Sequence, residues 1–171
     1  MPLKLHHPRR DDEDVLLLYL FIIAVLAFFL AVALLGGKAR AADMAEGDSI
    51  AKGTGAALHV PTYARTSMGS CWIFHNTPGG HFDHVVLSAG INDPPGPCLE
   101  ALRARLTAKS VVWILPAPIN AARAHVYAVA ARYGDRTVSY SCGRGGCTKR
   151  NFHPASYGQV AISVRNAWGL K

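Results

Sequence analysis

Hydrophobic residues are distributed in two different ways along this chain. Residues 15–35, VLLLYLFIIAVLAFFLAVALL, form one apolar run without a charged residue. At about 1.5 Å per residue, such a run spans roughly 31 Å as a helix, which is enough to cross a bilayer. From residue 38 onward, short apolar runs alternate with helical periodicity. The pattern predicts a polar tail at 1–14, a transmembrane helix or signal anchor at 15–36, a linker at 37–42 and a folded domain at 43–171.

The apolar run has an alternative interpretation as a cleaved signal peptide, because ARAAD at 39–43 contains an A-x-A pattern. Its length exceeds the roughly 7 to 15 residues of a typical signal-peptide core, which favours an uncleaved anchor. Basic residues on the two sides of the run, Lys4, Arg9 and Arg10 before it and Lys38 and Arg40 after it, slightly favour an N-terminus inside. We therefore expect a single-pass protein whose C-terminal domain is periplasmic or extracellular.

The domain alternates strand and helix patterns. Short β-rich runs predict buried strands at 84–90 and 110–116 and, more weakly, at 58–64 and 136–142. Helical periodicity occurs at 98–108 and 119–134, and a last helix is expected to begin near Pro154, since proline suits a first helical turn. This alternation predicts an α/β domain, a three-layer α/β/α sandwich with a central parallel sheet.

The domain is strongly basic. The chain has 18 Lys/Arg and 11 Asp/Glu, of which three and four precede residue 38, so 15 and 7 remain and leave a net charge of +8. A positive surface favours anionic lipid headgroups, acidic polysaccharide or nucleic acid. Because the sequence has no run of clustered Lys/Arg interleaved with aromatic residues, nucleic acid is not an expected partner.

All four cysteines follow the apolar run, at Cys71, Cys98, Cys142 and Cys147. An even number suits disulfides in an oxidising compartment, with three pairings open. A zinc site is the competing interpretation, but the separations of 27, 44 and 5 positions contain no C-x-x-C knuckle. The histidines His75, His81 and His84 lie in and beside a glycine-rich connection and suit a solvated surface better than a metal site. We expect no metal and no cofactor.

Four short segments stand where the predicted strands and the last helix meet their loops. GDSIAKG stands where a further strand ahead of the predicted four would end. TSMGSC follows the predicted strand at 58–64, GIND follows the one at 84–90, and TKRNFHP precedes the last helix. Taken alone, each segment is typical of a turn or a helix cap. Parallel α/β folds bind ligands at the carboxyl ends of their strands, so these segments are the candidate functional loops.

Together the segments resemble the SGNH hydrolase family, also called GDSL esterases and lipases, over roughly residues 43–168. The resemblance implies that Ser49 is the nucleophile and His153 the base. It also implies an oxyanion hole made by the backbone N–H groups of Ser49 and Gly69 and the side-chain amide of Asn92. The chemistry is consistent, because a serine hydroxyl at neutral pH needs an imidazole to take its proton as it attacks an ester.

The same resemblance implies a disulfide arrangement. The family alignment brings the loops around Cys71 and Cys98 near each other, so a bridge between them would pin the oxyanion hole. Cys142 and Cys147 would then close a small loop ahead of His153. This pairing is a hypothesis about one of the three pairings that four cysteines allow.

The last block departs from the family pattern. Three residues before the histidine the family has an aspartate, but this chain has Arg150. Loss of the acidic member of a triad costs about 10⁴-fold in turnover. Asn151 or a backbone carbonyl would then hold the ring of His153, and Asp48, Arg150 and Asn151 are candidates for orienting or substrate contacts.

The resemblance, together with the expected membrane anchor, implies a membrane-anchored serine esterase that removes acetyl or other small acyl groups from an envelope glycan or lipid. Two alternatives stay open. One is a catalytically degenerate SGNH-like binding domain, and the other is a membrane-anchored assembly component of an envelope or viral machine.

Overall fold

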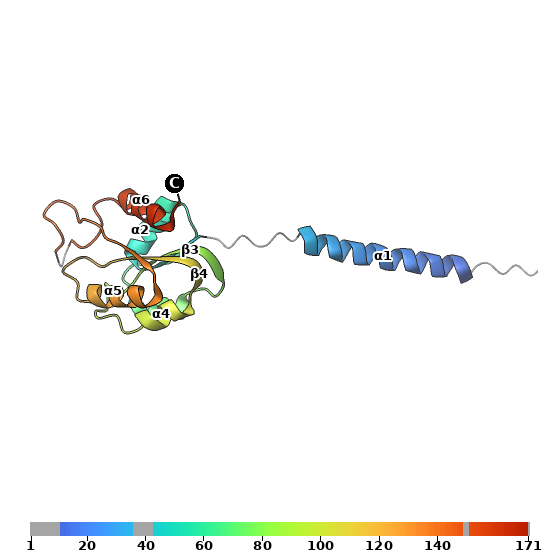
Figure 1. Ribbon diagram of the computed structural model, residues 1–171, viewed down its shortest axis with the longest axis horizontal. Coiled ribbons are helices and arrows are strands. Elements are labelled where there is room, and N and C mark those ends of the chain that lie inside the picture. The colour runs from blue at the N-terminus through green and yellow to red at the C-terminus, as the bar shows by residue number, and fades with distance from the viewer. Residues whose placement is uncertain (1–10, 36–42, 149–150, 171) are drawn as a thin grey trace, which may run out of the picture. The chain divides into compact units, whose positions relative to one another are not determined.

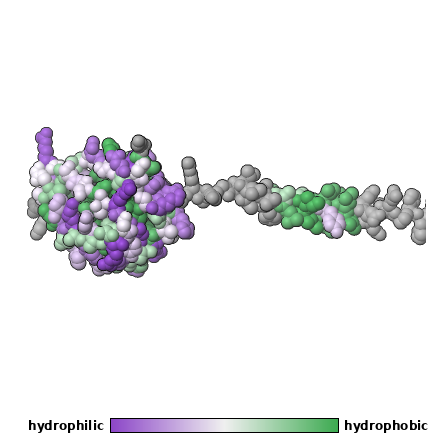
Figure 2. All heavy atoms as spheres, viewed as in Figure 1, coloured by the Kyte–Doolittle hydropathy of each residue, from purple (hydrophilic) through white to green (hydrophobic). Residues whose placement is uncertain are grey.

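The computed structural model describes residues 11–35, 43–148 and 151–170, with side chains of the first segment described from 15 to 28. The chain divides into two compact units, residues 1–40 and 41–171. In the first unit, helix α1 (Asp11–Leu35) carries mainly hydrophobic side chains in its described part, as Figure 2 shows. Within the described part of the chain, no helix combines the length and the apolarity that crossing a membrane requires. The membrane anchor therefore stays a prediction from the sequence.

The second unit is built on a five-stranded parallel sheet. Its strands are β1 (Met44–Gly47), β2 (Thr62–Ala64), β3 (His81–Ser88), β4 (Thr107–Ile114) and β5 (Arg136–Val138). Their order across the sheet is β2-β1-β3-β4-β5. The predicted central parallel sheet is confirmed, and each of the four predicted strand regions overlaps a strand of it, although β3 and β4 begin and end earlier than the sequence predicts.

Helices cover both faces of this sheet (Figure 1). They are α2 (Ser49–Leu58), α3 (Ser70–Asn76), α4 (Leu99–Arg105), α5 (Ala122–Tyr133) and α6 (Tyr157–Trp168). Alternate strand residues point to opposite faces, so Val85 packs in the core under α3, α4 and α5, whereas Val86 packs in the core under α2 and α6. The predicted α/β/α sandwich is thus observed, and burial on both faces explains the continuous apolar strands.

The last helix begins later than the sequence predicts. Pro154 is not in its first turn; instead it forms an isolated antiparallel bridge with Cys142. Ser156 is the N-cap, and its Oγ accepts a hydrogen bond from the backbone N–H of Gln159 at 3.3 Å. A serine cap satisfies a free N–H at the helix start, which a proline cannot do.

Helix α2 was not predicted from the sequence pattern. Two glycines within it, Gly53 and Gly55, each disfavour a helix by about 1 kcal/mol relative to alanine. Tertiary packing explains their presence, because a Cβ at Gly53 would lie 2.4 Å from the ring of Tyr157 in α6. The glycine therefore lets α2 and α6 approach closely on the same face of the sheet.

Candidate active site

Ser49 is positioned by the junction of β1 and α2. Asp48 caps the helix and is fully buried, and its Oδ1 accepts hydrogen bonds from the Ile50 N–H and the Ser88 hydroxyl, each at 2.9 Å. Ser49 follows as the first helical residue and is half-buried. Because it stands at the carboxyl end of β1, it lies at the edge where a parallel sheet presents its functional loops.

His153 meets Ser49 from the segment that precedes α6. The Ser49 Oγ and the His153 Nε2 lie 2.9 Å apart, although 104 positions separate the two residues. The imidazole stacks on the ring of Phe152, with centroids 4.6 Å apart, and the Tyr140 hydroxyl donates to the Phe152 carbonyl at 2.6 Å. The structure thus brings together the two residues that the resemblance assigns as nucleophile and base, and it braces the segment that carries the histidine.

The second nitrogen of the imidazole has a different environment. Among the residues that the structure describes, none hydrogen-bonds to the Nδ1 of His153. The structure shows no hydrogen bond from His153 to Asn151, whose side-chain NH2 donates to the Gly146 carbonyl at 3.0 Å, so the expectation that Asn151 holds the ring stays a prediction. Local hydrogen bonds between Asn151 and Thr148 keep this residue within its own turn. Arg150 lies outside the described residues.

The expected oxyanion donors come from three neighbouring loops. Because β1 lies between β2 and β3, the segments after these strands are adjacent at one edge of the sheet. Asn92 donates its side-chain amide to the Met68 carbonyl at 2.9 Å, which places it beside Gly69. The N–H groups of Ser49 and Gly69 make no hydrogen bond with any residue in the described part of the chain.

The loops that contain Gly69 and Asn92 are joined by a disulfide that was predicted and by hydrogen bonds that were not. Asp93 Oδ2 accepts hydrogen bonds from both the N–H and the hydroxyl of Ser70, each at 2.7 Å. The implied disulfide between Cys71 and Cys98 is present, with Cα atoms 4.8 Å apart. A Cβ at Gly69 would lie 2.7 Å from Asp93 Oδ2, so the turn needs glycine for close approach. Asp93 stood in the GIND motif, but only the three-dimensional structure shows that it clamps Ser70.

The second implied disulfide, between Cys142 and Cys147, is also present, with Cα atoms 5.0 Å apart. Next to it, the Ala155 N–H donates to the Ser141 carbonyl at 2.9 Å. This bond and the bridge between Cys142 and Pro154 fasten the chain on the C-terminal side of His153. The base is thus held by a braced loop rather than by a regular element.

Burial is the main cause of the raised pKa values of three side chains near the site. It raises the pKa of Asp48 to about 6, against the lowering effect of the hydrogen bonds from Ile50 and Ser88. Burial, and then the charge of Asp48, raises the pKa of Tyr140 and of Tyr157. Asp48 is not a substrate contact, because it has no exposed surface; it caps and orients the helix of Ser49.

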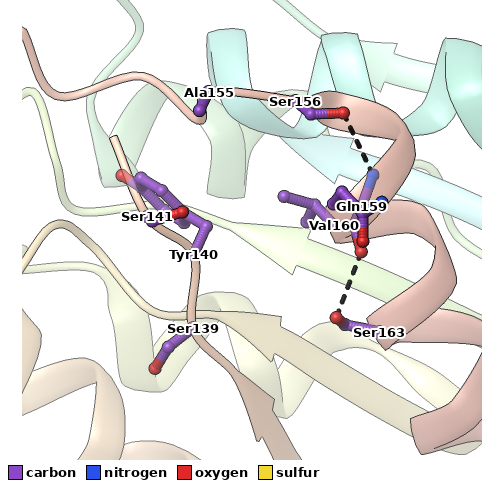
Figure 3. Close-up of a pocket in the computed structure, with 8 residues that line it drawn as sticks. All are labelled: Ser139, Tyr140, Ser141, Ala155, Ser156, Gln159, Val160 and Ser163. Atoms are coloured by element: carbon purple, nitrogen blue, oxygen red, sulfur yellow. Dashed lines mark hydrogen bonds between the residues drawn. The ribbon is translucent and has the colours of Figure 1, made fainter. Parts of the chain in front are cut away.

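A hollow of about 190 Å³ lies between the segment after β5 and the start of α6 (Figure 3). It is lined by Ser139, Tyr140, Ser141, Ala155, Ser156, Gln159, Val160 and Ser163. Figure 3 shows two of its hydroxyls used within α6, where Ser156 accepts from the Gln159 N–H and Ser163 donates to the Gln159 carbonyl. Neither Ser49 nor His153 lines this hollow, so it is not the reaction centre.

Comparisons with known proteins agree with the fold. No family model and no curated protein sequence matches the chain. Among solved structures, a GDSL-like lipase from Bacteroides thetaiotaomicron VPI-5482 is similar, with a TM-score of 0.51 and 15% sequence identity over 77% of this chain and 89% of that chain. At this identity the likeness shows the fold alone, an α/β fold like that of a GDSL lipase.

Proposed function

We propose that this protein is a serine ester hydrolase that works with a dyad of Ser49 and His153. The observation that carries the proposal is the 2.9 Å distance between the Ser49 Oγ and the His153 Nε2. In the first step, Oγ attacks the ester carbonyl as its proton moves to Nε2. The imidazolium then protonates the departing alcohol and leaves an acyl-enzyme. A water molecule, deprotonated by the same Nε2, releases the carboxylic acid and restores Ser49.

The oxyanion of each tetrahedral intermediate would be bound by the N–H groups of Ser49 and Gly69 and by the Asn92 amide. One hydrogen of that amide is used by the Met68 carbonyl, and the other remains for the substrate. Removing one such donor costs about 10² to 10³ in turnover. The clamp between Ser70 and Asp93 supports this arrangement, because it fixes the backbone next to Gly69.

The dyad lacks a described acidic partner at Nδ1. We expect its turnover to lie below that of a complete triad, by up to about 10⁴-fold. The stacking of Phe152 on His153 and the hydrogen bond from Tyr140 supply part of the missing orientation. The missing acidic partner at Nδ1 also favours one rival function, a degenerate SGNH-like domain that binds a ligand without hydrolysing it.

Substrate and location are proposed on chemical grounds. An acetyl or other small acyl group on an envelope glycan or lipid is the expected substrate, reached by a domain that residues 15–35 anchor to a membrane. Two disulfides support a periplasmic or extracellular position, since such bonds persist in oxidising compartments. The net charge of +8 on the domain, 15 basic against 7 acidic residues, supports an anionic envelope as its surroundings.

The test uses the full-length chain with its disulfides intact. A fluorophosphonate probe followed by peptide mass spectrometry should label Ser49, and p-nitrophenyl acetate should be hydrolysed. Ser49→Ala should lose both signals. Ser110→Ala is the matched control, because Ser110 lies in the first half of β4, away from the carboxyl edge of the sheet. It should keep both signals.

The outcomes separate the candidate functions. Labelling and turnover that disappear together in Ser49→Ala, and only there, support the hydrolase. A folded protein that shows neither signal refutes it and leaves the binding domain or the assembly component. In that case Ser49→Ala should leave the biological effect of the protein intact.

A further inference from the structure

We propose that the hydroxyl of Tyr157 donates a hydrogen bond to the alcohol part of the ester and so selects esters of sugars or other polyols. This inference rests on the proposed function and narrows its substrate class to alcohols that carry further hydroxyls, as in a glycan. Tyr157 is the first residue of α6 and belongs neither to the dyad nor to the expected oxyanion donors.

Tyr157 lies close to both reactive residues. It follows His153 closely along the chain, and its ring packs on Gly53, which stands one turn after Ser49 in α2. A Cβ at Gly53 would lie 2.4 Å from Cε1 and 2.6 Å from Cζ of the ring. Residues one turn apart on a helix have Cβ atoms about 5 to 6 Å apart, so Cζ of Tyr157 lies within roughly 9 Å of the Ser49 Cβ. The alcohol part of an ester bound at Ser49 spans such a gap.

The hydroxyl end of the ring is directed toward the start of α2. Burial, and then the charge of Asp48, raises the pKa of Tyr157, and Asp48 directly precedes Ser49. Because the interaction between charges weakens with distance, the phenol lies near this end of the helix. The raised pKa also keeps the proton on the phenol at neutral pH, so that Tyr157 is a hydrogen-bond donor.

The Tyr157 hydroxyl is placed where a ligand can reach it. The residue is half-buried, and its hydroxyl is not sealed from solvent. The neighbouring Tyr140 is engaged elsewhere, since its hydroxyl donates to the Phe152 carbonyl at 2.6 Å. Contact with Gly53 fixes the Tyr157 ring, so exchange of solvent for a substrate hydroxyl costs little side-chain entropy.

This position corresponds to the alcohol side of the reaction. In ester hydrolysis the base protonates the departing alcohol, so the alcohol lies beside the histidine, whereas the carbonyl oxygen points to the oxyanion donors. The expected donors Gly69 and Asn92 come from the loops after β2 and β3, but His153 and Tyr157 come from the segment that leads into α6 and from α6 itself. The alcohol is therefore the part of a bound ester that reaches Tyr157.

A phenol donor at this place discriminates between kinds of alcohol. A sugar or polyol carries oxygens next to its ester that accept the hydrogen bond. A simple alkyl alcohol covers the same donor without pairing it, which costs binding energy. One neutral hydrogen bond of this kind corresponds to about a tenfold preference.

The experiment compares glycerol 1-acetate with propyl acetate on the full-length chain. The two alcohols share one carbon skeleton and differ in their hydroxyls. Tyr157→Phe keeps the ring and removes only the donor, and it should lower the ratio of the two kcat/KM values, glycerol acetate over propyl acetate, by about tenfold. The intrinsic reactivities of the two esters cancel, because wild type and variant act on the same pair.

Tyr127→Phe is the matched control. Tyr127 exposes 58% of its surface on α5, a helix whose Val126 packs in the core on the other face of the sheet from α2 and α6. This variant also loses one phenol hydroxyl, and it should leave the ratio unchanged. A ratio that falls in Tyr157→Phe and not in Tyr127→Phe supports the inference.

The contrary results are distinguishable. An unchanged ratio in Tyr157→Phe shows that the hydroxyl does not contact the alcohol and overturns the inference, while the hydrolase stands. Equal losses with both esters in this variant assign Tyr157 to support of the dyad through Gly53 and also overturn it. No turnover of either ester and no fluorophosphonate label on Ser49 overturn the proposed function and this inference together.

Discussion

Replacement of Asp48 by asparagine tests how the nucleophile is supported. The carboxylate is fully buried and caps α2, accepting hydrogen bonds at Oδ1 from Ile50 and Ser88. Its Oδ2 is buried without a hydrogen-bond partner among the described residues. Asparagine keeps an oxygen for the two donors and is a good N-cap, but it carries no charge. Asp48→Asn should therefore retain the fold and remove the cost of burying an ionised group.

The magnitude follows from linkage between protonation and folding. Burial raises the pKa of Asp48 from 3.8 to about 6, so the folded state holds this proton more tightly than the unfolded state. The contribution of Asp48 to stability is present below pH 3.8 and is lost as the pH rises toward 6. At about 1.36 kcal/mol per pKa unit, this loss amounts to roughly 2 kcal/mol at pH 5 and about 3 kcal/mol at pH 8. The gain from Asp48→Asn should grow by about 1 kcal/mol between these two pH values.

The assay is urea unfolding of the full-length wild-type and variant proteins at pH 5 and pH 8. Glu100→Gln is the control for loss of one negative charge, since Glu100 is a partly exposed residue paired with Arg132 on the surface. Free energies of unfolding for wild type and Asp48→Asn that run parallel between the two pH values would refute the reasoning. A gain that increases with pH in Asp48→Asn, and does not do so in Glu100→Gln, would support it.

Two further changes probe the oxyanion loops. Gly69→Ala places a Cβ 2.7 Å from Asp93 Oδ2 and should displace the turn, lowering kcat for p-nitrophenyl acetate by about 10² with a small change in KM; full activity would show that the clamp is not needed. The double substitution Cys71→Ser and Cys98→Ser opens a loop spanning 27 positions and should lower the free energy of unfolding by about 3 to 4 kcal/mol in urea titrations, whereas an unchanged midpoint would contradict a structural role for the bridge.

Strands could be predicted from the sequence where helices bury both of their faces. The run around Val85 and Val86 is apolar on both sides because helices cover both faces, and it predicted β3 directly. β1 is harder to recognise, because its four residues include Glu46. Burial raises the pKa of that carboxyl to about 8, and the Thr77 hydroxyl donates to it at 3.2 Å. A buried glutamate of this kind depends on a partner 31 positions away, which no local pattern reveals.

Site residues could be predicted where they belong to short motifs that follow one another in a characteristic order along the chain. Ser49 and His153 were paired by the sequence of their blocks, and the structure places their side chains in contact. A role for Asn151 in holding the ring stays a prediction, because the hydrogen bonds that the structure shows for this residue are to Thr148 and Gly146 in its own turn. The clamp between Asp93 and Ser70 was missed for the opposite reason, since it exists only when two distant loops meet.

The close approach of α2 and α6 at Gly53 has a consequence for how loss of activity is interpreted. Ser49 begins one of these helices and His153 lies just before the other, so their separation depends on the thickness of the contact between Gly53 and Tyr157. A methyl group at position 53 would overlap the Tyr157 ring, so we expect it to push the two helices apart and to separate the nucleophile from the base, although both remain chemically intact. A variant at position 53 would therefore lose activity in the same way as a variant of Ser49 or His153, although residue 53 takes no part in the reaction.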